Sequence, residues 1–234
     1  MVKLSVIIPT LNEEKYIGKC LQSLKNQTFR DFEVIVADTV SKDRTAGIAK
    51  KYGARVVSTT KKGPAAGRNA GAEKAKGEIL VFTNADAVLS RNVLKSIVEK
   101  TSNKKIVGGV CSFYPLNGRF FDKVFFKFGN WISRASMKMN FTYSPGECLF
   151  VKKPVFQKIG GFREDLVFNE DNDLANSCFN FGKFIYLKAR VDISLRRYKK
   201  YGYFKTFKTY IAPTVFYMRT NQVPSTMFEL EAIR

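Results

Sequence analysis

The feature that most constrains the fold is a short apolar run that ends in polar residues. Ile79 to Phe82 is such a run, and Thr83-Asn84-Ala85-Asp86 follows it directly. Such runs are typical of strands buried on both faces of a sheet, and in open α/β sheets ligands bind at the carboxyl ends of the strands. A carboxylate such as Asp86 at that end suits Mg²⁺ or Mn²⁺. The alternative is that Asp86 caps the helix expected from about Arg91, or sits in a turn.

The first half of the chain alternates between short apolar runs and segments with helical spacing. Strands are expected at Leu4 to Ile8, Glu33 to Ala37, Arg55 to Ser58 and Ile79 to Phe82. Helices are expected around 16–24, 48–52, 64–75 and 93–98. Alternation at this spacing predicts an α/β fold, with a mostly parallel central sheet flanked by helices on both faces.

The second half is less regular. Strands are expected at Ile106 to Cys111, Glu147 to Val151, Ile185 to Leu187 and Val191 to Ile193, and helices at 120–135, 154–159 and from Asn169 onward. Because no linker separates the halves, we expect residues 1–105 and residues 106–195 to share one sheet. Residues 196–234 form a basic, aromatic C-terminal segment.

The net charge of +20 on 234 residues predicts an anionic partner, which could be a nucleic acid, an anionic membrane surface or a phosphorylated substrate. The chain has no histidine, which excludes His-dependent triads and His general bases. Its four cysteines lie far apart, which excludes zinc-finger spacing and favours reduced thiols, as in a cytosolic protein. Neither a signal peptide nor the ~18 apolar residues of a membrane span is visible.

Acidic residues stand where several expected elements begin or end. Asp38, Asp86 and the Glu170-Asp171 pair would meet at one rim of a doubly wound sheet. One carboxylate for a metal and another as general base is the minimum for moving a group from a nucleoside diphosphate onto a hydroxyl. Each carboxylate could instead cap a turn or helix. Three arginines, whose guanidinium groups match phosphate oxygens, could neutralise the diphosphate or simply be solvated: Arg68, Arg196 and Arg197.

Several segments resemble the family 2 glycosyltransferases, which have the GT-A nucleotide-sugar fold. The segments are Pro9-Thr10-Leu11-Asn12-Glu13, Val34 to Thr45 around Asp38, Gly67-Arg68-Asn69-Ala70-Gly71, Asn84-Ala85-Asp86 in the place of a D-x-D motif, Gly160-Gly161-Phe162 with Glu170-Asp171-Asn172-Asp173-Leu174, and Ser194-Leu195-Arg196-Arg197-Tyr198. Their matching order from about Leu4 to Gly202 is far more specific than any single motif.

The resemblance implies an inverting transferase in which residues 1–105 bind a UDP- or GDP-linked sugar and residues 106–195 bind the acceptor. Asp171 would deprotonate the acceptor, and Mn²⁺ or Mg²⁺ would bind Asp86. The acceptor would be a glycan or a molecule of the polyprenyl-phosphate type, and the sugar would be transferred to its hydroxyl or phosphate. The remaining matches are Pro9, Thr10, Asn12, Glu13, Asp38, Arg68 and Asn84 for the nucleotide, Arg196 and Arg197 for the diphosphate or a lid, and Gly146, Glu147 and Glu170 for the acceptor side.

Two departures from the family pattern leave alternatives open. Asn84 replaces the first carboxylate of the D-x-D motif, so we expect weaker metal binding. Thr39-Val40 replaces the usual Asp-Gly on the ribose side. A relative that binds nucleotide-sugar without transferring it is therefore a second hypothesis. A nucleic-acid-binding module is a third, but it leaves the carboxylates unexplained and nucleic acid is not the expected partner.

An aromatic helix and a basic C-terminal segment favour contact of the protein with a membrane surface. Over 120–135 an apolar face is flanked by Lys123, Lys127, Arg134 and Lys138. This pattern is typical of an interfacial membrane helix, but also of a core helix with a solvated edge. The segment after Arg197 again mixes aromatic and basic residues, which suits lipid headgroups. We expect a cytoplasmic protein held peripherally at the inner face of the cell membrane.

Overall fold

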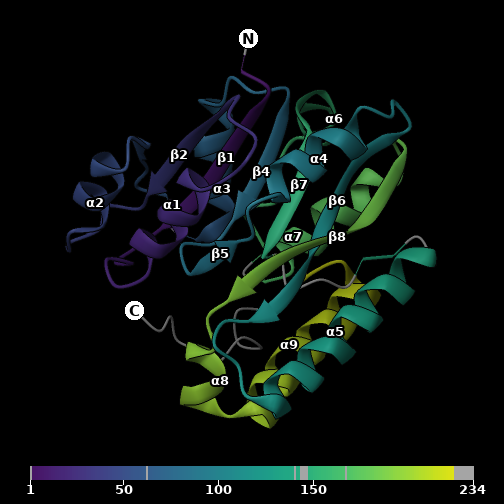
Figure 1. Ribbon diagram of the computed structural model, residues 1–234. Helices are drawn as coiled ribbons and strands as arrows, with labels where there is room; N and C mark the ends of the chain where they lie inside the picture. Colours follow the sequence, from purple (N-terminus) through teal and green to yellow (C-terminus); the bar gives the residue numbers. More distant parts are fainter. Residues whose placement is uncertain (1, 62, 140, 143–146, 167, 224–234) are drawn as a thin grey trace.

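The computed structural model describes residues 2–61, 63–139, 141–142, 147–166 and 168–223, and within them one sheet of eight strands organises the molecule (Figure 1). The strands are β1 (Leu4–Thr10), β2 (Phe32–Asp38), β3 (Arg55–Ser58), β4 (Ile79–Thr83), β5 (Ala87–Leu89), β6 (Ile106–Pro115), β7 (Cys148–Lys152) and β8 (Lys183–Ile193). The helices are α1 (Ile17–Lys25), α2 (Thr45–Lys51), α3 (Pro64–Glu73), α4 (Val93–Thr101), α5 (Phe120–Lys138), α6 (Lys153–Ile159), α7 (Glu170–Cys178), α8 (Arg196–Tyr201) and α9 (Tyr203–Thr220).

The central strands are buried on both faces, as their unbroken apolar sequences predict. In β1, Val6 and Ile8 pack with residues of α1 and α4, whereas Ile7 packs on the opposite face with residues of α3, α6 and α7. Side chains alternate between the two faces along each strand, so both layers of helices are attached by the same strands. The predicted α/β fold with helices on both faces is confirmed.

The strand order is β3-β2-β1-β4-β7-β6-β8-β5. Strands β1 to β4 pair in parallel, as expected for the first half, and β6 pairs in parallel with β8. Strand β7 is antiparallel to both β4 and β6, so the second half makes the sheet mixed. Strand β5 comes from the first half yet pairs with β8 at the far edge, which interlocks the two halves.

Three features differ from the sequence-based expectations. Strand β5 was not expected, because three residues are too short to show a periodic pattern. The two strands expected around Leu187 and Val191 are parts of the single strand β8, whose register against β6 shifts between Cys111 and Ser112. The polar residues in between, Lys188 and Arg190, hide this continuity in the sequence. Finally, the basic C-terminal segment forms two helices, α8 and α9.

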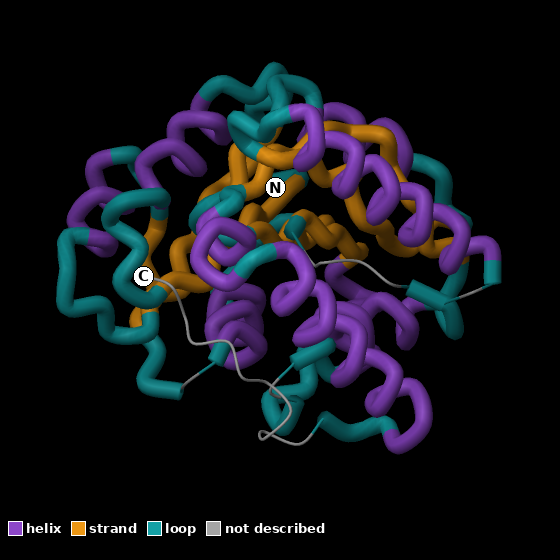
Figure 2. Tube along the Cα trace, turned by 90° about the horizontal axis from the view of Figure 1, so that it is seen from below, coloured by secondary structure: helices purple, strands orange, loops and turns teal. Residues whose placement is uncertain are grey.

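Helices α5 and α9 lie side by side beyond the ends of β6 and β8, on the lower side of the molecule (Figures 1 and 2). The rings of Phe121 on α5 and Tyr203 on α9 meet edge to face, with centroids 5.3 Å apart. Only Phe126, Asn130 and Ser133 of α5 are buried. Most aromatic side chains of α5 are exposed, whereas Phe126 joins the core, so the choice between an interfacial helix and a core helix with a solvated edge stays a prediction.

Candidate active site

The carboxyl ends of β1 and β2 form the first wall of the site. The parallel register pairs Thr10 with Asp38, and the Thr10 hydroxyl donates a hydrogen bond of 2.9 Å to Asp38 Oδ1. Ser41 also donates to Asp38, from its backbone N–H at 2.9 Å and from its hydroxyl at 2.5 Å. The buried Asp38 carboxylate thereby fixes the loop after β2 against β1. Asn12, with a left-handed φ of 55°, accepts from the Lys42 N–H and completes this loop pair.

Arg196, the first residue of α8, is held between two carboxylates of the first half. Its Nη1 and Nη2 donate to the two oxygens of Glu13 at 2.7 and 2.8 Å. Its Nε lies 2.9 Å from Asp86 Oδ2 as an ion pair, without the geometry of a hydrogen bond. The guanidinium also stacks on the Tyr16 ring, 4.5 Å from its centroid. Burial raises the pKa of Glu13, and the Arg196 contacts partly offset this rise.

A second network is centred on Arg68 of α3. The buried Arg68 guanidinium pairs with Glu170 at the start of α7, and its Nη2 lies 3.3 Å from Asn84 Oδ1. Asn84 Nδ2 donates to Glu147 Oε2 at 2.9 Å. Asn84 is thus a neutral link between a cation and a carboxylate. The Glu170 carboxylate faces Arg68, and its contact with an acceptor stays a prediction.

Two carboxyl groups of the site have strongly raised pKa values. Burial, reinforced by the negative charge of Asp86, raises the pKa of Glu147 to about 8. Burial and the neighbouring Glu170 raise the pKa of Asp171 to about 7, against the lowering effect of Arg68. A carboxylate with a pKa near neutrality is suited to accept a proton in a reaction, because it ionises at working pH yet remains basic.

Arg197 and Tyr210 lie between the two networks. Arg197 Nη1 donates to the Tyr210 hydroxyl at 2.6 Å, which ties α8 to α9. The charge of Arg197 acts on both Glu147 and Asp86, and Tyr210 is influenced by Glu147 and Asp171. Among the described residues no carboxylate forms an ion pair with Arg197, so this largely buried guanidinium is available to an anionic ligand.

The remaining predicted residues have diverse surroundings. Pro9 packs against α3 so closely that a Cβ added at Gly67 would lie 3.1 Å from the Pro9 Cβ, which explains the glycine in that helix. Glu147 lies beside Asn84, next to the predicted metal ligand. Gly146 lies outside the described residues. The structure thus brings the donor-side predictions and Asp171 to one rim of the sheet.

Sequence reasoning missed three residues that shape this rim. Tyr16 carries Arg196 on its ring, Ser41 fixes Asp38, and Tyr210 binds Arg197. In the sequence, Tyr16 looks like one of the apolar residues that recur with helical spacing over 16–24. Tyr210 lies in a tail with many aromatic residues, and nothing in the sequence distinguishes it from its neighbours.

The donor set fits a divalent cation that brings other ligands with it. Asp86 supplies a carboxylate oxygen, and it already contacts a cation, the Arg196 guanidinium. In the described part of the chain no three Asp, Glu, Cys or His side chains are grouped to hold a metal alone. A hard cation that takes one or two carboxylates and completes its shell with phosphate oxygens and water matches this arrangement.

The chain is similar in sequence to known glycosyltransferases. The chain is 39% identical over 103 residues to the poly(ribitol-phosphate) beta-N-acetylglucosaminyltransferase TarS of Staphylococcus aureus, which is 41% of this chain and 18% of TarS. It is 34% identical over 109 residues, 44% of this chain, to a GalNAc(5)-diNAcBac-PP-undecaprenol beta-1,3-glucosyltransferase of Campylobacter jejuni, of which it covers 35%. The chain therefore spans well under half the length of these two relatives.

Solved structures share the fold. The mannosyltransferase PcManGT from Pyrobaculum calidifontis, in complex with GDP-Man and Mn²⁺, matches 97% of this chain and 67% of its own with a TM-score of 0.72 at 22% identity. TarS 1-349 in complex with UDP-GlcNAc matches 82% of this chain and 58% of its own, with a TM-score of 0.66 at 23% identity. Both are nucleotide-sugar complexes, and the predicted GT-A fold is confirmed. The sequence profile of Glycosyl transferase family 2 matches residues 5–160, and the chain belongs to this family of glycosyltransferases.

Proposed function

We propose that this chain transfers a sugar from a UDP- or GDP-linked donor to an oxygen of an acceptor, with inversion at the anomeric carbon. The observation that carries the proposal is the placement of Glu147, whose titration is affected by both Asp86 and Asp171. The charges of the predicted metal ligand and the predicted base both reach Glu147, which supports one site shared by a donor diphosphate and an acceptor. The two solved structures named above are complexes with GDP-Man and UDP-GlcNAc, which supports the donor class.

The donor would lie along the ends of β1, β2 and β4. Asp38, with Pro9, Thr10 and Asn12 around it, would contact the base and ribose. A bound Mn²⁺ or Mg²⁺ would be held by Asp86 and would stabilise negative charge on the diphosphate. Arg197, whose charge no carboxylate pairs among the described residues, would meet the same diphosphate. Arg196 would also contact the diphosphate once its hydrogen bonds to Glu13 are broken. Arg68 and Asn84 would keep Glu147 in place.

In the reaction the acceptor oxygen attacks the anomeric carbon as the bond from that carbon to the diphosphate breaks. The electron pair of that bond leaves with the diphosphate. The proton of an acceptor hydroxyl passes to the Asp171 carboxylate, whose pKa of about 7 makes it a competent base. For a phosphate acceptor that is already ionised, Asp171 would only orient the nucleophile.

We place the acceptor at a membrane surface, where it would be a lipid-linked or cell-surface glycan or a polyprenyl-phosphate-type molecule, and the protein at the inner face. Among the described residues no helix is long and apolar enough to cross a bilayer. Support comes from the exposed rings of α5 and α9, among them Phe120, Trp131 and Phe204, beside exposed lysines such as Lys123 and Lys127. Aromatic rings flanked by basic residues suit an anionic headgroup region.

The proposal is tested by thermal unfolding in the presence of UDP, GDP, UDP-GlcNAc and GDP-mannose, each with and without Mn²⁺. A ligand at a hundredfold excess over its dissociation constant stabilises the folded state by about 2.7 kcal/mol, which is readily measured. We expect one nucleotide to raise the melting temperature and Mn²⁺ to increase its effect. If none of the nucleotides stabilises the protein under either condition, the proposed donor class is wrong. Single-stranded oligonucleotides serve as the comparison for the rival nucleic-acid function.

A further inference from the structure

We propose that the pocket between α5, α7, α8 and α9 is a binding site for an apolar chain, and that this chain belongs to the acceptor. The inference rests on the proposed transferase function, because it is the base Asp171 that ties the pocket to the reaction. The volume open to the centres of water-sized molecules is about 90 Å³. No residue of this pocket other than Asp171 was singled out by the sequence for a role in catalysis.

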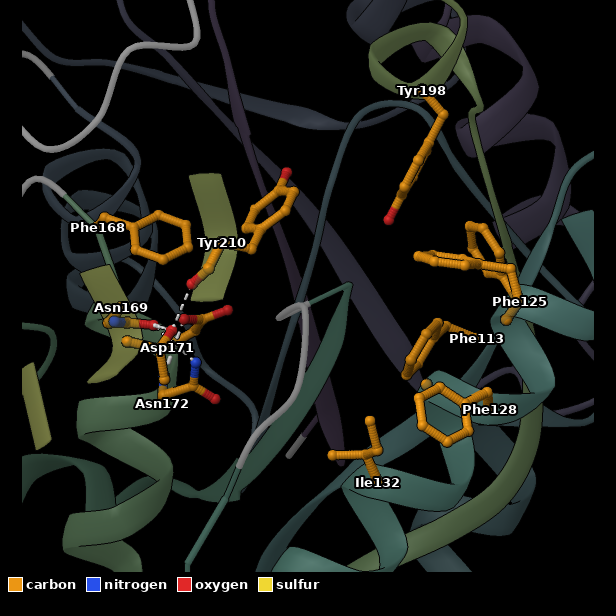
Figure 3. Close-up of a pocket in the computed structure, with 13 residues that line it drawn as sticks. Phe113, Phe125, Phe128, Ile132, Phe168, Asn169, Asp171, Asn172, Tyr198 and Tyr210 are labelled. Atoms are coloured by element: carbon orange, nitrogen blue, oxygen red, sulfur yellow. Dashed lines mark hydrogen bonds between the residues drawn. The ribbon is translucent and has the colours of Figure 1, made fainter. Parts of the chain in front are cut away.

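The two walls of the pocket differ in chemistry (Figure 3). The wall formed by α5, α8 and β6 is aromatic and aliphatic. Its side chains include Phe113, Phe125, Phe126, Phe128, Ile132 and Tyr198. Most polar lining groups come from the opposite wall, at the start of α7 and on α9, where Asn169, Asp171, Asn172, Tyr210 and Thr214 lie, and the aromatic wall adds the Tyr198 hydroxyl. A ligand that fills this space is therefore amphipathic, with its polar end at α7.

Asn169 supplies an independent sign of a ligand at the polar end. Its side chain is 1% exposed, and its Nδ2 has no hydrogen-bond partner among the described residues. Its Oδ1 accepts from Asn172 Nδ2 at 3.0 Å and lies 3.1 Å from the Thr214 hydroxyl, which also lies 2.8 Å from the Tyr210 carbonyl oxygen. A buried donor without a partner is costly, and an oxygen of a ligand headgroup would satisfy it.

The position of Asp171 identifies the occupant as the acceptor. A base must lie within hydrogen-bond reach of the oxygen that it deprotonates, so the acceptor oxygen belongs at the α7 end of the pocket. Whatever is attached to that oxygen on the pocket side then contacts the aromatic wall. A free sugar would leave its hydroxyls unpaired there, whereas an isoprenoid or alkyl chain would bury apolar surface.

The apolar wall also reaches the outer surface of α5. Phe128 lines the pocket yet is 54% exposed, and its ring stacks on Trp131 at 5.8 Å between centroids. A chain longer than the pocket can therefore continue outward past these rings. Since the chain contains a single tryptophan, Trp131 is also a natural reporter at the mouth of the pocket.

The test is a titration with farnesyl phosphate below its micelle concentration, in the absence of vesicles, followed by the emission of Trp131 and by calorimetry. Farnesol tests whether the apolar chain suffices, and inorganic phosphate tests the headgroup alone. We expect saturable binding of farnesyl phosphate with a stoichiometry of one and none of inorganic phosphate. Farnesol binding would assign the affinity to the chain, and its failure to bind would assign part of it to the phosphate.

Variants locate the site. Ile132→Asn and Phe128→Asp place polar groups in the apolar wall and should each weaken binding about tenfold or more, which corresponds to about 1.4 kcal/mol. Phe120→Asp is the matched control, because Phe120 is an exposed residue of the same helix that does not line the pocket. Asn169→Asp, which removes the free donor, should weaken binding of farnesyl phosphate but change binding of farnesol less.

Two results would overturn the inference: no saturable binding of farnesyl phosphate, or equal weakening by Phe120→Asp and the pocket variants. The outcome is separate from that of the donor test. Nucleotide stabilisation without farnesyl phosphate binding would leave the transferase function standing and remove the apolar acceptor site. Farnesyl phosphate binding without nucleotide stabilisation would keep the pocket and remove the proposed donor.

Discussion

Arg196 Nε lies 2.9 Å from Asp86 Oδ2, while the two terminal nitrogens of the same guanidinium bind both oxygens of Glu13. One residue of α8 thus carries the positive charge for two carboxylates at the ends of β1 and β4. The side chains of Glu13 and Asp86 are 13% and 12% exposed, so water screens them little. The Asp86 carboxylate, which the family resemblance assigns to a metal, is already paired with a cation, the Arg196 guanidinium.

The first prediction concerns this guanidinium. Arg196→Ala leaves Glu13 and Asp86 close together without a counter-charge, and breaking a buried pair in this way costs about 3–5 kcal/mol. We expect a clear fall in melting temperature. Mn²⁺ should then restore more stability to the variant than it adds to the wild type, because the metal replaces the missing cation. Thermal unfolding with and without Mn²⁺ measures both effects.

Arg44→Ala is the matched control for that experiment. Arg44 forms an exposed ion pair with Glu14 at 3.1 Å, and exposed pairs contribute little to stability. This variant should unfold close to the wild-type temperature and respond to Mn²⁺ as the wild type does. An Arg196→Ala protein that behaves like Arg44→Ala would show that Arg196 does not balance the two carboxylates.

The second prediction separates Asp171 from its neighbour Glu170. Asp171→Asn should leave nucleotide binding intact and lower turnover about 100-fold or more, the effect of losing a general base. Glu170→Gln should instead destabilise the fold, because it leaves the buried Arg68 without its partner carboxylate. Calorimetry with nucleotide, turnover and thermal unfolding are measured on both variants. Normal turnover by Asp171→Asn would move the role of base to another residue.

The third prediction follows from the raised pKa of Asp171, which burial and Glu170 bring to about 7. The base must be ionised to work, so turnover should fall as the pH drops below about 7. The same shift affects stability. Because the folded-state pKa lies above the ~3.9 of an unfolded aspartic acid, this group favours the folded state below about pH 4, and the contribution is lost as the pH rises through 7.

Asp171→Asn removes the buried charge, so it should raise the melting temperature most at pH 8, less at pH 5 and little at pH 4. A gain of about 1 kcal/mol would correspond to about 2–4 °C for a chain of this size. Asp165→Asn provides the comparison: Arg163 lowers the pKa of that exposed carboxyl, and its replacement should bring no gain at pH 8. Equal behaviour of the two variants at all of these pH values would contradict the buried charge at Asp171.

Much of the fold could be predicted because its central strands are buried on both faces and therefore have unbroken apolar sequences. The positions of Asp38 and Asp86 followed from the same reasoning, since each stands where such a strand ends. Strand β8 was predicted as two pieces because its exposed residues, among them Lys188 and Arg190, interrupt the apolar pattern. Periodicity reports burial, and where one face of a strand is solvated the signal weakens.

The contacts across the site could not be predicted in the same way. The bond from Arg196 to Glu13 joins residues 183 positions apart, and no local pattern encodes such a pairing. The resemblance placed Arg196 near a diphosphate, yet the structure shows it bound to carboxylates. The pocket is a further case. Its walls come from five separate elements, and the free amide of Asn169 is visible only when α7 and α9 are packed together.

The fourth prediction is that the protein binds anionic vesicles through α5 and α9. Each Lys or Arg near an anionic surface contributes about 1 kcal/mol, and α5 alone carries exposed Lys123, Lys127, Arg134 and Lys138. Exposed rings would add apolar burial. Binding measured by vesicle sedimentation should be strong at low salt and clearly weaker with zwitterionic vesicles at the same salt concentration, where only the rings contribute.

The two contributions respond differently to salt and to substitution. Charge attraction weakens as the screening length falls from about 10 Å at 0.1 M towards 3 Å at 1 M, whereas insertion of rings does not depend on screening. High salt should therefore release the wild type only in part, and should release completely a variant that combines Phe120→Ser, Trp131→Ser and Phe204→Ser, whose rings are 83%, 64% and 83% exposed. Phe181→Ser removes an exposed ring outside both helices and should bind like the wild type. A wild-type protein that ignores anionic vesicles even at low salt would contradict the membrane surface and favour contact of the exposed rings with another protein.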